Sequence, residues 1–166
     1  MPRGSRPFER WGMLGSAGLA EIAETEQIMA GTSPATVADV MRPPATTVDQ
    51  NDHVAAAAYL MRHAGATALV VLDGQTTNRP IGLITEADIV HAVADGRDLN
   101  EVRILDLMTA GPTVVKKTTG IRDAAETMMA GHFRHLPVVD EAAGLTGIVD
   151  MRDICRALLE LAPPGP

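Results

Sequence analysis

The chain of 166 residues has few aromatic side chains (2%), a single cysteine, and only two lysines, Lys116 and Lys117. One cysteine cannot form an internal disulfide, which favours a reducing cytoplasm. No apolar run approaches the ~20 residues that a membrane span requires, and the charged residues near Met1 are not followed by the apolar core of a signal peptide. The 14 basic and 21 acidic residues give a formal charge of −7, whereas nucleic acid attracts clustered cations. We therefore expect an acidic cytoplasmic protein that binds neither membranes nor nucleic acid.

The sequence contains an internal duplication. Asp39–Met41 and Asp106–Met108 are opening motifs of the form Asp-hydrophobic-Met, placed 67 positions apart. After a two-residue gap in a turn-like stretch, Gly82–Ile89 matches Gly147–Ile154. A register held over about 50 residues indicates two copies of one structural unit.

Each copy predicts a β-α-β-β-α unit. Helices are expected where apolar residues recur at i, i+3, i+4 and i+7, and strands where short β-rich runs lie between turn signals. In the first copy these elements fall at 46–49, 53–64, 68–72, 81–84 and 86–94. In the second copy they fall at 113–116, 120–131, 135–139, 145–149 and 151–161. The expected N-caps of the first helix in each copy are Asn51 or Asp52, and Thr118 or Thr119.

A three-stranded sheet with helices on one side leaves its other face uncovered, so the two units are expected to pack through their sheets. The fold class is therefore α/β (α+β), with residues 34–98 and 99–161 as pseudo-symmetric units. Residues 162–166 are expected to be a frayed tail. Residues 1–33 form an arm outside the repeat, partly disordered, with a helix expected at 16–30. This arm is either a packing or dimerisation element or a contact for a partner protein.

The duplicated opening motifs, the Gly82–Asp88 pattern Gly-h-h-Thr-x-x-Asp and the segment His132–Asp140 resemble a tandem pair of CBS (cystathionine-β-synthase) domains, known as a Bateman module. The resemblance covers about 36–161. It implies a regulatory module that binds an adenosine-containing nucleotide (AMP, ADP or ATP) in a cleft between the units. It also implies a homodimer that modulates a separate effector protein, with no obligatory cofactor. S-adenosylmethionine or adenosine is the alternative ligand.

Thr85 and Asp88 fall at a junction between a strand and a helix, where backbone N–H groups attract anions. A carboxylate at Asp88 can accept both hydroxyls of a ribose, and Thr85 can bond a phosphate or ribose oxygen. The same Thr-x-x-Asp pattern is also a helix capping box. By resemblance, the remaining ligand-binding residues of this first site are Leu83, Thr113, Val115, Arg134, His135, Pro137 and Arg152. Their cationic groups suit a phosphate, whereas His132 and His135 lack a third ligand, so no metal site is expected.

The second cleft departs from the family pattern. Asp150 stands where the first cleft has Thr85, and the first-unit positions that match Arg134 and His135 carry no charge. Two carboxylates without cations disfavour a phosphate. We therefore expect one nucleotide-competent site and a second that is empty or takes an uncharged adenosine moiety. The residues of this weaker second site are Asp150, Asp153, Ile148, Thr46, Val48 and Val70.

No enzyme is expected. The sequence has no phosphate-binding or dinucleotide-binding glycine loop, no Cys-x-x-Cys and no His-Glu-x-x-His motif, and Cys155 is assigned to the core side of the last helix. The main alternative function is a ligand-free dimeric scaffold that captures a partner through residues 16–30. Mutation of Asp88 would leave such a scaffold unchanged.

Overall fold

The structure, a computed structural model, describes residues 35–43, 46–73, 77–142 and 144–161. The chain divides into residues 1–34 and 35–166, and all described residues belong to the second unit. The expected arm at 1–33, its helix at 16–30 and the expected tail at 162–166 lie outside the described residues.

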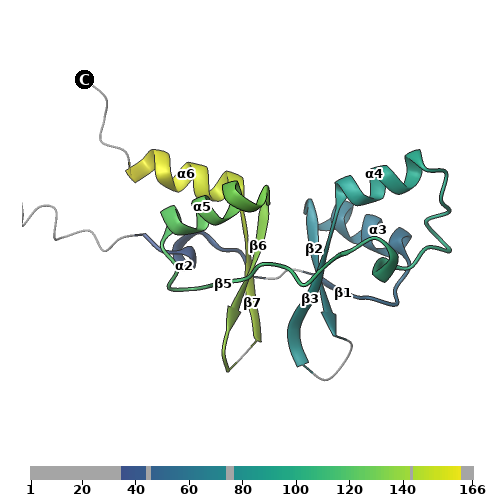
Figure 1. Cartoon of the computed structure of the whole chain (residues 1–166), viewed down its shortest axis with the longest axis horizontal. Helices are drawn as coiled ribbons and strands as arrows, with labels where there is room; N and C mark the ends of the chain where they lie inside the picture. Colours follow the sequence, from purple (N-terminus) through teal and green to yellow (C-terminus); the bar gives the residue numbers. More distant parts are fainter. Residues whose placement is uncertain (1–34, 44–45, 74–76, 143, 162–166) are drawn as a thin grey trace, which may run out of the picture. The chain divides into compact units, whose positions relative to one another are not determined.

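Both repeats contain the predicted β-α-β-β-α order of elements (Figure 1). The first repeat consists of α2 (Val37–Val40), β1 (Thr47–Asp49), α3 (Val54–Ala64), β2 (Ala68–Asp73), β3 (Thr77–Thr85) and α4 (Glu86–Ala94). The second consists of a 3-10 turn η1 (Ile104–Asp106), β4 (Thr109–Ala110), β5 (Val115–Lys116), α5 (Ile121–Gly131), β6 (His135–Asp140), β7 (Gly144–Asp150) and α6 (Met151–Leu161). The mixed α/β fold class is confirmed.

The two sheets have the same internal topology. In each, a short strand runs parallel to the first strand of an antiparallel hairpin, so that β1 pairs with β2 and β2 with β3, while β5 pairs with β6 and β6 with β7. The sheets contact each other through β3 and β7, and Figure 1 shows the main helices of each repeat on the outer side of its own sheet.

The opening segments of the two repeats are exchanged. β4 comes from the second repeat but pairs antiparallel with β3 of the first, which gives the first sheet a fourth strand beyond the three expected. Reciprocally, Arg42 of the first repeat forms a two-bond antiparallel bridge with Ile148 on β7, with N···O distances of 2.9 and 3.0 Å. Each opening segment therefore pairs through backbone hydrogen bonds with the last strand of the other repeat.

The hydrophobic cores follow the same exchange. The core of the second repeat includes Val37 from the first opening segment, and that of the first includes Val102 and Ile104 from the second. Val37 and Ile104 are fully buried. Burying such a side chain stabilises a fold by about 1.5–3 kcal/mol, so each repeat depends on a residue that the other supplies.

The expected N-caps are wrong by one or two residues. The N-cap of α3 is His53 and that of α5 is Gly120, and neither side chain caps its helix. Both residues form antiparallel bridges, His53 with Arg103 and Gly120 with Thr36. The backbone at each helix start is thus held by an exchanged segment, which a local sequence pattern cannot indicate.

The assignment of Cys155 to the core is also wrong, because the residue is exposed on α6. The inner face of α6 consists of Asp153, Ile154 and Ala157, and the helical period turns position 155 outward. No helix in the described part of the chain is both long and apolar enough to cross a bilayer.

Gly144→Ala is expected to destabilise the protein more than Gly65→Ala. Both glycines have left-handed φ angles, +74° and +61°, which cost other residues about 1–2 kcal/mol. A Cβ at Gly144 would also collide with the backbone carbonyl of Asn78 in the other repeat, whereas Gly65 has open space. Overpacking of this kind adds about 1–3 kcal/mol. Urea denaturation measures the free energy of unfolding of both variants. Equal decreases in the two variants would contradict the close approach of β7 to Asn78.

Candidate functional site

A cavity of about 600 Å³ opens between the two repeats. It is bounded by the β3–α4 junction of the first repeat and by the α5–β6 connection and the β7–α6 junction of the second. Its lining residues are Thr67, Leu83, Thr85, Glu86, Ala87, Thr109, Pro112, Thr113, His132, Phe133, Arg134, His135, Asp150, Met151 and Arg152. We call it the large cavity. Its volume falls within the range of about 300–1,000 Å³ that is typical of small-molecule sites.

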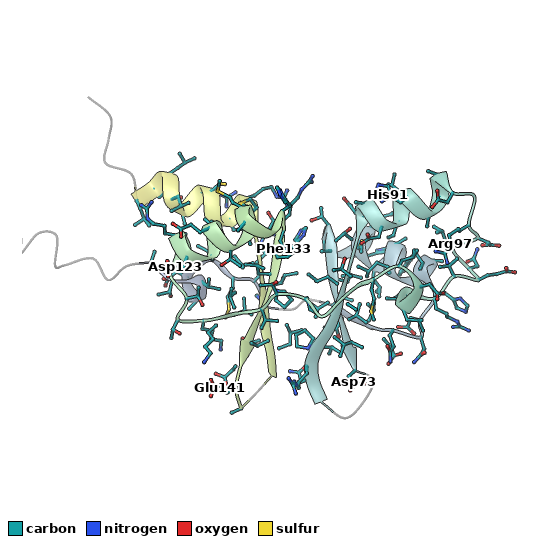
Figure 2. All side chains as sticks on the ribbon, in the orientation of Figure 1. Asp73, His91, Arg97, Asp123, Phe133 and Glu141 are labelled. Atoms are coloured by element: carbon teal, nitrogen blue, oxygen red, sulfur yellow. The ribbon has the colours of Figure 1, made fainter. Side chains whose placement is uncertain are left out.

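Most of the residues predicted for the first site line the large cavity: Leu83, Thr85, Thr113, Arg134, His135 and Arg152. Asp88, Val115 and Pro137 do not line it. Val115 and Pro137 point into the protein, and Val115 belongs to the core of the second repeat. Sequence reasoning missed the apolar wall formed by Pro112 and Phe133, the latter labelled in Figure 2.

Asp88 lies in the first turn of α4 and forms a capping box with Thr85. Its Oδ2 accepts hydrogen bonds from the Thr85 backbone N–H at 2.8 Å and from the Thr85 hydroxyl at 2.7 Å. The Asp88 N–H donates back to Thr85 Oγ1 at 3.4 Å. The capping role and the ligand role are compatible, because both bonds use Oδ2 and Oδ1 has no partner among the described residues.

Equivalent backbone hydrogen bonds fix the two strand–helix junctions beside this cavity. The N–H of Glu86 donates to the Thr67 carbonyl at 3.1 Å, and the N–H of Met151 donates to the Arg134 carbonyl at 2.8 Å. These bonds tie the start of α4 and of α6 to the segment that precedes β2 and β6. The side chains of Arg134 and Arg152 are thereby brought to one wall.

His135, Asp150 and Arg152 form a charged cluster at this wall. His135 Nε2 lies 3.1 Å from Asp150 Oδ2 and 2.8 Å from the hydroxyl of Thr67 in the other repeat. Asp150 Oδ1 accepts from the Arg152 backbone N–H at 2.7 Å and from its Nε at 3.2 Å. The guanidinium is well exposed while the imidazole and carboxylate are mostly buried, so Arg152 is the group that a ligand can reach.

Burial and charge act in opposite directions on this cluster. Burial lowers the pKa of His135, and the neighbouring Asp150 carboxylate only partly offsets it. Burial by itself raises the pKa of Asp150, but hydrogen bonds from the Arg152 backbone and guanidinium outweigh it and leave that pKa below its ordinary value. At neutral pH the cluster therefore consists of a neutral imidazole, a carboxylate and a guanidinium.

A second cavity, of about 110 Å³, occupies the pseudo-symmetric position. We call it the small cavity. Its lining residues are Arg42, Pro43, Thr46, Ala64, Gly65, Ala66, Thr67, Ala68, Leu69, Val70, His135, Ile148, Asp150 and Arg152. Of the residues predicted for the second site, Thr46, Val70, Ile148 and Asp150 line it, whereas Asp153 and Val48 do not. Val48 is part of the core of the first repeat.

The premise that the second cleft has no cation is wrong. Arg42, His135 and Arg152 all line the small cavity. Arg42 Nη2 lies 2.8 Å from Asp153 Oδ1. The repeat offset of 67 places Arg42 at the position of Thr109, but this alignment does not indicate that Arg42 reaches Asp153, 111 residues away. The described residues contain no group of three or more side chains suited to hold a metal ion.

Comparison with known sequences gives a consistent match. The family model of the CBS domain matches residues 37–95 and again 104–160. An uncharacterised 17.7 kDa protein of Acidianus ambivalens is 40% identical over 114 residues, which is 69% of this chain and 67% of that protein. The chain spans 61% and 42% of the lengths of relatives from Methanopyrus kandleri and Methanocaldococcus jannaschii, at 32% and 33% identity.

Solved structures share the fold. CBSX2 from Arabidopsis thaliana, crystallised in complex with AMP, is 30% identical with a TM-score of 0.63, and the match covers 76% of this chain and 97% of that chain. The CBS domain pair of protein MJ0100, in complex with 5-methylthioadenosine and S-adenosyl-L-methionine, is 25% identical with a TM-score of 0.67, covering 75% and 99%.

His135→Gln is expected to weaken the decrease in the free energy of unfolding that occurs below neutral pH. The folded-state pKa of His135 lies below its ordinary value of 6.5, so the neutral ring stabilises the fold above that pH, and this contribution is lost as the pH falls through the lowered pKa. The measurement is urea denaturation at several values between about pH 7.5 and 5. His63→Gln, at an exposed position on α3, is the control. A pH dependence unchanged in His135→Gln would contradict this assignment.

Proposed function

The chain belongs to the CBS domain family, and from this premise we propose that it is a regulatory module whose large cavity binds an adenosine-containing nucleotide, AMP, ADP or ATP. The observation that carries the proposal is the large cavity itself, which combines a suitable volume with a strand–helix junction and exposed guanidinium groups. Solved relatives that carry AMP support this ligand class.

The cavity offers a separate surface for each part of a nucleotide. Asp88 itself does not line the cavity, but it follows Thr85, Glu86 and Ala87, which do. We place its Oδ1 at the ribose hydroxyls, while Thr85 binds Oδ2 and so orients the carboxylate. Leu83, Pro112 and Phe133 provide apolar contacts for a base. A phosphate fits against Arg134 and Arg152, because guanidinium groups bind phosphate oxygens in a bidentate way.

Charge favours a phosphorylated ligand over S-adenosylmethionine in the large cavity. Arg134 is exposed, and Arg152 is exposed while bound to Asp150 on one side only. A phosphate can replace the Asp150 carboxylate as the partner of Arg152. This exchange leaves neither the Asp150 carboxylate nor the Arg152 guanidinium in an apolar environment. S-adenosylmethionine carries a cationic sulfonium and a single carboxylate in place of phosphate groups, so it offers these guanidinium groups less negative charge.

We further propose that ligand binding modulates a separate effector protein, in the cytoplasm and without catalysis or an obligatory cofactor. A homodimer is the proposed form, supported by exposed apolar side chains on the last helix of each repeat: Val90 and Val93 on α4, and Leu159 and Leu161 on α6. Sedimentation equilibrium tests the dimer, and a single 17.5 kDa species would contradict it.

A thermal-shift panel of AMP, ADP, ATP, adenosine and S-adenosylmethionine tests the ligand class. A ligand at about 100 times its Kd stabilises the folded state by ~2.7 kcal/mol, which corresponds to a rise in Tm of roughly 5–11 °C for a chain of this size. We expect such a rise with a phosphorylated adenosine ligand. Asp88→Ala is expected to abolish it.

Asp39→Ala is the matched control for Asp88→Ala. Asp39 Oδ2 accepts hydrogen bonds from the Thr36 N–H at 2.7 Å and from the Thr36 hydroxyl at 3.2 Å, although the Thr36 side chain accepts no capping hydrogen bond in return. No residue of α2 lines either cavity, whereas Glu86 and Ala87 next to Asp88 line the large one. Each variant loses the N3 carboxylate of a helix start and is destabilised without ligand, so only the ligand-induced rise in Tm is compared. No shift with any of the five compounds would favour the ligand-free scaffold.

A further inference from the structure

The large and small cavities are built from equivalent positions of the two repeats, yet their volumes are about 600 and 110 Å³. Several pairs of equivalent lining residues differ in chemistry, and two of them bear on Asp88 and its counterpart Asp153. The large cavity has Thr109 and Thr85 where the small cavity has Arg42 and Asp150. These two differences place a guanidinium and a carboxylate in the lining of the small cavity where the large cavity has two hydroxyl groups.

Asp150 does not give Asp153 the hydrogen bonds that its counterpart Thr85 gives Asp88. In the first repeat, Thr85 donates from its backbone and its hydroxyl to Asp88. In the second repeat, Asp150 has no hydroxyl to donate, and its Oδ1 instead accepts the Arg152 N–H. Asp153, the counterpart of Asp88, is therefore left without the donors that a capping box supplies.

Asp153 is nevertheless 92% buried, since its exposed fraction is 8%. A buried carboxylate needs a charged or hydrogen-bonding partner. Arg42 is that partner: its Nη2 lies 2.8 Å from Asp153 Oδ1, while the buried Oδ2 has no hydrogen-bond partner among the described residues. One oxygen of this carboxylate is thus occupied and the other is unsatisfied.

Arg42 is held at this place by its backbone. Its N–H and carbonyl both bond to Ile148 on β7, so the residue cannot move away from the mouth of the small cavity without breaking the exchange between the repeats. The side chain is 59% exposed. The guanidinium can therefore rotate into solvent even though its backbone stays fixed.

We propose that Arg42 is an internal occupant of the small cavity that excludes a second ligand by binding Asp153 in place of a nucleoside. This inference rests on the proposed function, because it assigns to Asp153 the ribose contact proposed for Asp88. The wild-type chain then binds a single adenosyl ligand, in the large cavity.

Occupation by Arg42 and repulsion by carboxylates predict different ligand behaviour. The carboxylates of the small cavity are accompanied by Arg42, Arg152 and His135, so charge alone does not exclude an anion. If repulsion by Asp150 and Asp153 closed the cavity, it would still admit uncharged adenosine. If Arg42 closes it, adenosine is excluded as well.

The test is the binding stoichiometry of adenosine and of AMP, measured by equilibrium dialysis on the full chain. The wild type is expected to bind one equivalent of each. Arg42→Thr, which introduces the residue present at position 109, is expected to bind a second equivalent of adenosine and so to double the stoichiometry. Arg122→Thr, at an exposed position of α5, is the control and is expected to bind one equivalent.

A second variant protects the test against misfolding, because Arg42→Thr leaves the buried Asp153 unpaired. The double variant Arg42→Thr/Asp150→Thr gives Asp153 the donors that Thr85 gives Asp88, and it is expected to bind two equivalents of adenosine. One equivalent in every folded variant, or two in the wild type, would overturn the inference. Binding of neither compound to the wild type would instead overturn the proposed function.

Discussion

The reciprocal backbone pairing of the two opening segments is the constraint on which the rest of the structure depends. β4 pairs with β3 of the other repeat, and Arg42 pairs with Ile148 on β7. The nearby Val37 and Ile104 each pack into the hydrophobic core of the other repeat. A single repeat would lack both a core residue and a strand-edge partner. The two repeats therefore fold as one body, and cavities with walls from both repeats follow directly.

This arrangement also makes the two cavities share a wall. Thr67, His135, Asp150 and Arg152 line both of them. A phosphate that takes Arg152 away from Asp150 in the large cavity changes the charge that Asp150 presents to the small one. The Asp150 carboxylate is partly buried, where charge interactions are stronger than in water, so a phosphate bound to Arg152 would change the electrostatic environment of the small cavity.

The sequence predicted the elements well because their signals are local and occur twice. The helical spacing of Ile121, Ala124 and Met128 and the alternation along β7 fix which faces are buried. The first-site residues that line the large cavity were likewise predictable from the repeat and the resemblance. The N-caps at His53 and Gly120 were not, because exchanged segments hold these positions through contacts distant in sequence. The Arg42–Asp153 pair, 111 residues apart, was missed for the same reason.

Asp150 and Arg42 are linked through Asp153, because each of them affects how this carboxylate is satisfied. With threonine at position 150, Asp153 would accept two hydrogen bonds from its own helix start, and the Arg42 guanidinium would gain little by leaving water, as exposed ion pairs contribute about 0–1 kcal/mol. With threonine at position 42 and Asp150 retained, a carboxylate that is 8% exposed would lose its cation. Because the Arg42 side chain is 59% exposed, this loss costs less than the breaking of a fully buried pair. The absence of a threonine cap at position 150 and the presence of an arginine at position 42 are thus energetically linked. Because both act on the counterpart of Asp88, this linkage distinguishes the strand–helix junction of the second repeat from that of the first.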